Sequence, residues 1–221
     1  MSAFPGSPRL IKGGIVLVDP TSGQLLKMIS LQYNPDTLTR SLQIKAAGGE
    51  GGGDRSQALR LKGAAVETIK LEAVLDATDQ LEYPDSNPNA VKHGVHPQLA
   101  VLEAMAYPQS AAMRANDRLA GSGALEVLPV EAALALFVWS KSRIVPVRLT
   151  ELSVTEEAFD PTLNPIRAKV SLGLRVLSVD DLGFGHKGGV LFMNYLQAKE
   201  TLASKATPNG LSALGLEGLP A

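Results

Sequence analysis

The sequence predicts a mainly β domain of the α+β class, in which antiparallel strands form a sandwich or an open barrel with one or two helices. Two observations predict this fold class. Apolar and polar residues alternate with a period of two in residues 66–76 and 168–176, as in strands that bury one face. Turn-forming residues also separate short apolar runs along most of the chain, which gives seven or eight strands.

The first predicted element is a hairpin, in which two β-rich runs flank a turn at residues 19–23. Pro20 presets φ in this turn, and Gly23 accepts a positive φ. Asn34 and Pro35 end the second strand, because the residue before a proline is disfavoured in the helical region and asparagine bonds its own backbone.

A short alternating segment, residues 38–45, follows, and then a loop at residues 47–56 with five glycines between positions 48 and 53. We expect this loop to be mobile. Residues 66–76 are the clearest strand. Its apolar face holds Ile69, Leu71, Ala73 and Leu75, and its polar face holds Thr68, Lys70 and Glu72.

Residues 133–139 and 144–154 predict a second hairpin around residues 140–143. The apolar phase of its return strand changes near Thr150, which predicts a β-bulge. In the last strand, residues 168–176, the polar face holds Lys169, Ser171 and Arg175.

Two segments have helical spacing, residues 96–107, with Pro97 in the first turn, and residues 190–206. Residues 108–123 show no clear period and predict a long connection. We expect one domain over residues 1–206 and a flexible tail over residues 207–221.

Composition narrows the function classes. The chain has 221 residues, 45% hydrophobic and 19% charged, which fits one folded domain. Its 21 basic and 22 acidic residues leave a net charge of −1, with no basic excess for nucleic acid. The absence of cysteine excludes disulfides and thiolate sites and suits folding in the cytoplasm. The first residues lack the apolar region of a secretory signal, and the longest apolar run, residues 132–139, is too short to cross a bilayer.

Three patterns could carry chemistry, and each has a plainer interpretation. Residues 183–188 match G-x-G-x-x-G, but only 33 residues follow, so a helix-entry loop is favoured over a dinucleotide site. His93 and His96 have metal-ligand spacing only in a helix, whereas Pro97 places the helix start there. The acidic pairs Asp76 with Asp79, Glu156 with Glu157, and Asp180 with Asp181 fit solvated turns and strand ends. We expect no catalytic residue, no cofactor and no metal.

Longer runs resemble a known family. YNPDTL, LDATDQLE, HPQLAVLEAMAYP and EEAFDPTLNPIRA are similar to the contractile injection system tube-protein family, in particular to the N-terminal domain of its LysM-type members. The likeness covers about residues 9–200. Its turn motifs contain Asn34, Pro35, Asp76, Asp79, His96, Pro97, Phe159, Asp160, Pro161, Asn164, Pro165 and Arg167. Too few residues follow the last predicted helix for a LysM module.

The resemblance implies a phage-tail tube type of fold and a non-enzymatic, structural role. It implies a homo-hexameric adaptor ring that joins the inner tube to the baseplate and spike hub of a phage-tail-like particle assembled in the cytoplasm. The implied partners are further copies of the chain, the inner tube protein, and spike, hub and baseplate wedge proteins, without nucleic acid or membrane insertion. The loop at 47–56 would order against the next ring.

A ring subunit needs a polar face for a wet bore and strand edges for its neighbours. The candidates for this lumen or interface surface are Lys70, Glu72, Lys169, Ser171 and Arg175. Ordinary solvent exposure explains these five residues equally well. The main inner-tube subunit, a monomeric ligand-binding β-barrel and an enzyme remain as alternatives.

Overall fold

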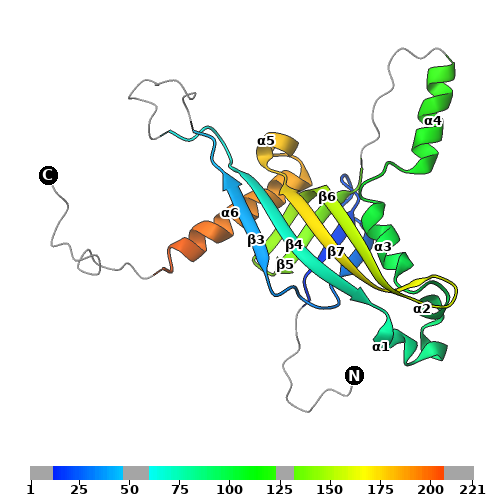
Figure 1. Ribbon diagram of the computed structural model, residues 1–221. Helices are drawn as coiled ribbons and strands as arrows, with labels where there is room; N and C mark the ends of the chain where they lie inside the picture. Colours follow the sequence, from blue (N-terminus) through cyan, green and yellow to red (C-terminus); the bar gives the residue numbers. More distant parts are fainter. Residues whose placement is uncertain (1–11, 47–59, 123–131, 207–221) are drawn as a thin grey trace.

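The computed structural model describes residues 12–46, 60–122 and 132–206. Within these residues, seven strands form one antiparallel sheet in the order β2-β1-β5-β6-β7-β4-β3 (Figure 1). The predicted fold class, mainly β with accompanying helices, is therefore confirmed. The glycine-rich loop at 47–56 and the tail at 207–221 lie outside the described residues, so the expectations about them, and the domain boundary at 206, stay predictions.

The predicted strands are present, with some changes of length. Their bounds are β1 (Gly14–Val18), β2 (Leu25–Ser30), β3 (Leu38–Gln43), β4 (Val66–Asp76), β5 (Leu134–Ser140), β6 (Arg143–Phe159) and β7 (Pro165–Val176). The pairing of β6 with β7 shifts register between Leu149 and Glu151, which confirms the predicted bulge. β6 continues to Phe159, beyond the predicted end at 154, because β7 pairs with it along its whole second half.

More helices are present than the one or two predicted. They are α1 (Thr78–Leu81), the 3-10 turn η2 (Pro84–Ser86), α2 (Pro88–His93), α3 (His96–Glu103), α4 (Ser110–Gly121), α5 (Val179–Leu182) and α6 (Lys187–Ala203). The predicted connection at 108–123 was wrong, since most of it is α4. This helix buries no residue, but Ala112, Ala115 and Leu119 recur at helical spacing, so the sequence contained a signal that was overlooked.

The last helix starts three residues earlier than predicted. His186 lies before its first turn, and its Nδ1 accepts a hydrogen bond from the backbone N–H of Gly188 at 3.0 Å. This bond satisfies one of the helix's free N-terminal donors. The G-x-G-x-x-G run is therefore the entry loop of α6, as its plainer interpretation predicted.

One hydrophobic core joins both ends of the sheet. Side chains from β1 and β2 share a cluster with those from β4 and β7, although these strand pairs lie on opposite sides of the sheet order. The sheet therefore curls around its core, and β3, β4 and β7 cross in front of β5 in Figure 1. Phe192 and Tyr195 of α6 and Leu99 and Leu102 of α3 complete the core. No helix within the described ranges is long and apolar enough to cross a membrane.

Candidate assembly surfaces

The five residues nominated for a polar surface lie together on the side of the sheet that faces away from the core. Lys70 and Glu72 of β4 lie opposite Gly173 and Ser171 of β7 in the strand register. Lys169 and Arg175 continue the same face of β7, and β6 adds Glu151, Ser153 and Thr155. We call this surface of β4, β7 and the second half of β6 the polar sheet face. The structure brings the nominated residues to one surface, and their role in a bore stays a prediction.

Charges of opposite sign alternate across the polar sheet face. Lys169 Nζ lies 2.6 Å from Glu157 Oε1, Arg167 Nε lies 3.4 Å from Glu157 Oε2, and Lys70 Nζ lies 3.6 Å from Glu151 Oε2. The hydrogen bond from Lys169 and the nearby positive charges lower the pKa of Glu157, against a smaller opposing effect of burial. Exposed pairs of this kind contribute little to stability, because water and salt screen them. The face is therefore hydrophilic without a strong net charge.

Strand β3 leaves one backbone edge open. The N–H of Ala77 donates to the carbonyl of Ile166 at 2.9 Å, which fixes the alternation of hydrogen-bonded pairs between β4 and β7. Alternate residues of β4 bond to β7, and the residues between them bond to β3. In the β3–β4 register, the backbone N–H and C=O groups of Leu38, Arg40 and Leu42 therefore point away from β4, toward the open edge. These groups need partners outside the described sheet.

The second half of β6 has a similar open edge. β5 pairs with β6 only as far as Val147, whereas β7 pairs with β6 to its end. The N–H of Leu177 donates to the carbonyl of Pro146 at 2.9 Å, which identifies the β6 residues that bond to β7. Following the β6–β7 register from this pair, the backbone groups of Leu152, Val154 and Glu156 point away from β7. Strands β3, β4, β7 and this half of β6 thus form a four-stranded band with two open edges.

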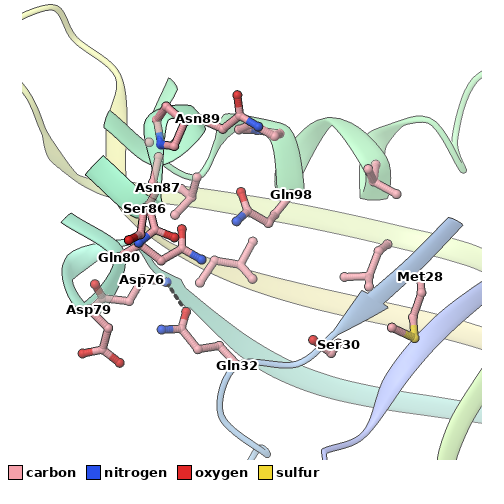
Figure 2. Close-up of a pocket in the computed structure, with 18 of the residues that line it drawn as sticks. Met28, Ser30, Gln32, Asp76, Asp79, Gln80, Ser86, Asn87, Asn89 and Gln98 are labelled. Atoms are coloured by element: carbon pink, nitrogen blue, oxygen red, sulfur yellow. Dashed lines mark hydrogen bonds between the residues drawn. The ribbon is translucent and has the colours of Figure 1, made fainter. Parts of the chain in front are cut away.

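Strand β2 provides a third open edge. The N–H of Leu31 donates to the carbonyl of Gly13 at 2.8 Å, so the backbone groups of Met28 and Ser30 point away from β1. Beside this edge lies a cleft of about 650 Å³ (Figure 2). Side-chain amides from the surrounding helical segments and loops line the cleft. Those labelled in Figure 2 are Gln32, Gln80, Asn87, Asn89 and Gln98. Amides can donate and accept hydrogen bonds, and the buried Oε1 of Gln98 has no partner within the described residues.

A second, smaller pocket of about 240 Å³ lies at the other end of the strands. It is lined mainly by apolar side chains, among them Leu17, Met105, Leu149 and Leu182, and its charged lining residue is Arg148. Such a lining suits an apolar side chain.

The FDPTLNP motif forms the tight turn between β6 and β7. One carboxylate oxygen of Asp160 accepts hydrogen bonds from the backbone N–H groups of Thr162 and Asn164 at 2.7 and 2.9 Å, and the Asn164 side chain donates to the other at 2.8 Å. The Asn164 side chain and backbone, assisted by Thr162, lower the pKa of Asp160 to about 2. Asn164 also donates to the carbonyl of Lys92 at 3.1 Å, which ties the turn to α2. Phe159, Pro161, Pro165 and Arg167 belong to this turn or the strands that flank it.

The other motif residues are also turn and cap residues, spread over the fold. Asn34 accepts from the N–H of Gly13 at 2.9 Å and so joins the chain before β1 to the turn after β2, with Pro35 half-buried beside it. Asp76 accepts from the N–H of Thr78 at 2.8 Å at the start of α1. Burial opposes its ionisation, but Thr78 and Arg167 outweigh this effect and lower the pKa of Asp76. Asp79 lines the cleft of about 650 Å³ beside β2.

Several of the histidine and acidic candidates are held by ion pairs or caps. His96, at the start of α3 with Pro97 next to it, lies 3.7 Å from Glu156. Asp180 pairs with Lys45 at 2.9 Å, and Asp181 completes the N-terminal capping box of α5 and pairs with Arg175 at 2.7 Å. The described residues contain no group of three or more histidine and acidic side chains placed to hold a metal ion.

Sequence reasoning missed Glu67, a buried carboxylate beneath α6. Tyr195 Oη donates to it at 2.9 Å, Lys199 Nζ lies 2.8 Å away, and Arg40 Nε lies 3.3 Å away. The network ties edge strand β3 to β4 and α6. A signal was present, because position 67 shares the parity of the apolar face that contains Ile69. Its partners could not be identified, since Tyr195 lies 128 residues away in the chain.

Comparisons with known proteins bear on what these surfaces are for. The search of curated proteins finds no match. One solved structure that matches is the tail of an empty GTA particle with C6 symmetry, at 11% identity and a TM-score of 0.30, covering 75% of this chain and 90% of that chain. The family profile described as contractile injection system tube protein matches residues 16–181, most of the chain and all seven strands except the first two residues of β1. The chain therefore belongs to the contractile injection system tube protein family.

Proposed function

We propose that this protein is a structural ring subunit, whose copies join side by side through the open edges of β3 and the second half of β6. The observation that carries the proposal is the four-stranded band with an open edge at each side. An antiparallel band with an even number of strands has edge strands that run in opposite directions. When identical copies stand side by side in the same orientation, β3 of one copy therefore pairs antiparallel with β6 of the next. A rotation repeated from copy to copy closes them into a ring.

The side chains at the two edges support this pairing. Leu152 and Val154 of β6 lie opposite the buried Leu172 and Val170 of β7, so they belong to the core side of the band. On β3, Leu42 shares that side and is 49% exposed in the single chain. A β3–β6 contact between copies would cover this apolar surface and pair the open backbone groups together.

The same arrangement accounts for the polar sheet face. In a closed ring the bands form one continuous wall, and their polar faces lie on the same side of it. We infer that this side is the wet bore, with Lys70, Glu72, Lys169, Ser171 and Arg175 lining it. The alternating charges avoid the strong single-sign field that would bind a charged cargo tightly.

Within the particle, we propose that the ring is a sixfold adaptor, assembled in the cytoplasm, that joins the inner tube to the baseplate and spike hub. The support is the similarity of the turn motifs to LysM-type family members. On this proposal the protein performs no catalysis, and its contacts are with its own copies, the inner tube protein, and spike, hub and wedge proteins. A main tube subunit differs in copy number: quantitative mass spectrometry of purified particles gives one or two rings for an adaptor and many for the tube.

The ring is tested by electron microscopy and mass photometry of the purified chain. Leu42→Lys places a charge at the β3 edge, and we expect it to abolish rings while the monomer stays folded. The matched control is Leu119→Lys on α4, because Leu119 is exposed to a similar extent, 51%, and α4 lies apart from both edge strands in Figure 1. Rings that survive Leu42→Lys, or that are lost equally in Leu119→Lys, contradict the proposal.

A further inference from the structure

The turn between β6 and β7 holds an exposed leucine in a backbone conformation that leucine rarely adopts. Leu163 has φ 65°, and among the described residues it is the one non-glycine residue with positive φ. Its side chain is 77% exposed. A bulky residue in the left-handed region is strained, and exposed apolar surface favours association.

The turn is also rigid. Besides the bonds to the Asp160 carboxylate, the backbone N–H of Leu163 donates to the carbonyl of Asp160, and the N–H of Asp160 donates to the carbonyl of Asn164, both at 2.9 Å. The fold therefore presents Leu163 on a fixed tip and loses little freedom when that tip is bound.

The smaller pocket offers a complementary surface. At about 240 Å³ it is below the range of about 300–1,000 Å³ in which small-molecule sites fall, and its lining is mainly apolar. It is therefore sized for a protein side chain. Its charged lining residue is the cationic Arg148, whereas the tip carries the anionic Asp160.

The tip and the pocket of one chain cannot meet. The tip lies where β7 begins, at Pro165, and the pocket is lined by Leu177, just after β7 ends at Val176. A strand of this length spans about 40 Å at roughly 3.3 Å per residue. The tip can enter such a pocket only on a second molecule.

We propose that Leu163 of one copy inserts into the apolar pocket of a second copy, so that copies join end to end along their strands. Because the two surfaces differ and lie at opposite ends, the contact is heterologous and leaves a tip free at one end and a pocket free at the other. The inference rests on the proposed ring: a ring presents several tips on one rim and several pockets on the other, and this multivalency strengthens ring-on-ring stacking.

The test uses the lack of natural cysteine in the chain. Leu163→Cys protein is mixed with Ala133→Cys protein, whose substituted side chain lies at the exposed lining of the pocket, and a short bismaleimide is added. We expect a cross-linked pair that contains one copy of each variant. The control mixes Leu119→Cys with Ala133→Cys and should cross-link at least tenfold less, because the exposed Leu119 belongs to α4, which lies far from the β6–β7 turn in Figure 1. A yield no greater than that of the control overturns the inference.

A second set of variants measures stacking. Leu163→Gly suits the positive φ and removes the side chain, so it should keep the thermal stability and the single rings but reduce stacking at least tenfold in electron micrographs. Leu163→Met should stack like the unmodified protein. Stacking unchanged by Leu163→Gly overturns the inference. Single rings without the specific cross-link contradict only this inference, and the specific cross-link without rings contradicts only the proposed ring.

Discussion

The central strands β4 and β7 differ sharply from the edge strands β2 and β3, although all four contain apolar residues. In β4 and β7 the core-facing side chains, such as Ile69 and Leu174, are fully buried. In β2, Leu25 and Met28 are 59% and 66% exposed. A strand buries its apolar face only where neighbouring elements cover it, and the described residues leave the apolar side chains of these edges exposed. On the proposed ring, another copy covers those of β3.

Leucine truncation should separate the two kinds of strand by the largest margin. Leu172→Ala in β7 creates a cavity in the core and should lower the free energy of unfolding by about 2–5 kcal/mol. Leu42→Ala in β3 should lower it by about 0.5 kcal/mol or less, because the side chain is half exposed in the monomer. Urea denaturation under monomeric conditions measures both values.

The same two variants, Leu172→Ala and Leu42→Ala, also compare the central and edge strands in the assembled ring. On the proposed ring the contact of Leu42 lies between copies, so Leu42→Ala should weaken ring formation more than it weakens the fold. An equal loss of stability in the two variants would show that the edge residue is already packed within the single chain.

Glu67 is an exception to this division, because it is a buried carboxylate on the central strand β4, beneath α6. Glu67→Ala removes the shared partner of Tyr195, Lys199 and Arg40 and should destabilise the fold by about 1–3 kcal/mol. The matched control is Glu72→Ala, an exposed carboxylate on the same strand, which should change stability by no more than about 0.5 kcal/mol. Thermal and urea unfolding of the two variants provide the measurement, and equal effects would contradict a buried network.

The sequence predicted the central strands more completely than their surroundings. The range 66–76 is found unchanged, and the polar residues of β4 and β7 share one face, because alternation within a strand is a local property. The open edges required the strand order and register, which depend on contacts between distant segments. The helix α4 was missed although its apolar residues recur at helical spacing, because that pattern is short and consists mostly of alanine. Leu163 gave no signal in its residue type, since its φ is set by hydrogen bonds around Asp160.

The smallest expected effect concerns the turn between β6 and β7, which is stabilised by hydrogen bonds to the Asp160 carboxylate and not by burial of apolar side chains. The pKa of Asp160 is lowered from 3.8 to about 2, chiefly by the side chain and backbone of Asn164. A lowered pKa means that the unfolded chain takes up the proton first, so the carboxylate's contribution to stability is complete above about pH 4 and is lost as the pH falls toward 2. A carboxyl NMR titration should give a midpoint near 2 for Asp160, and Asn164→Ala should move it upward, toward 3.8. A midpoint near 3.8 in the unmodified protein would mean that the tip is not held by this carboxylate. The apolar core side chains of β4 and β7, such as Ile69 and Leu174, do not titrate, so their contribution to stability should show no such pH dependence.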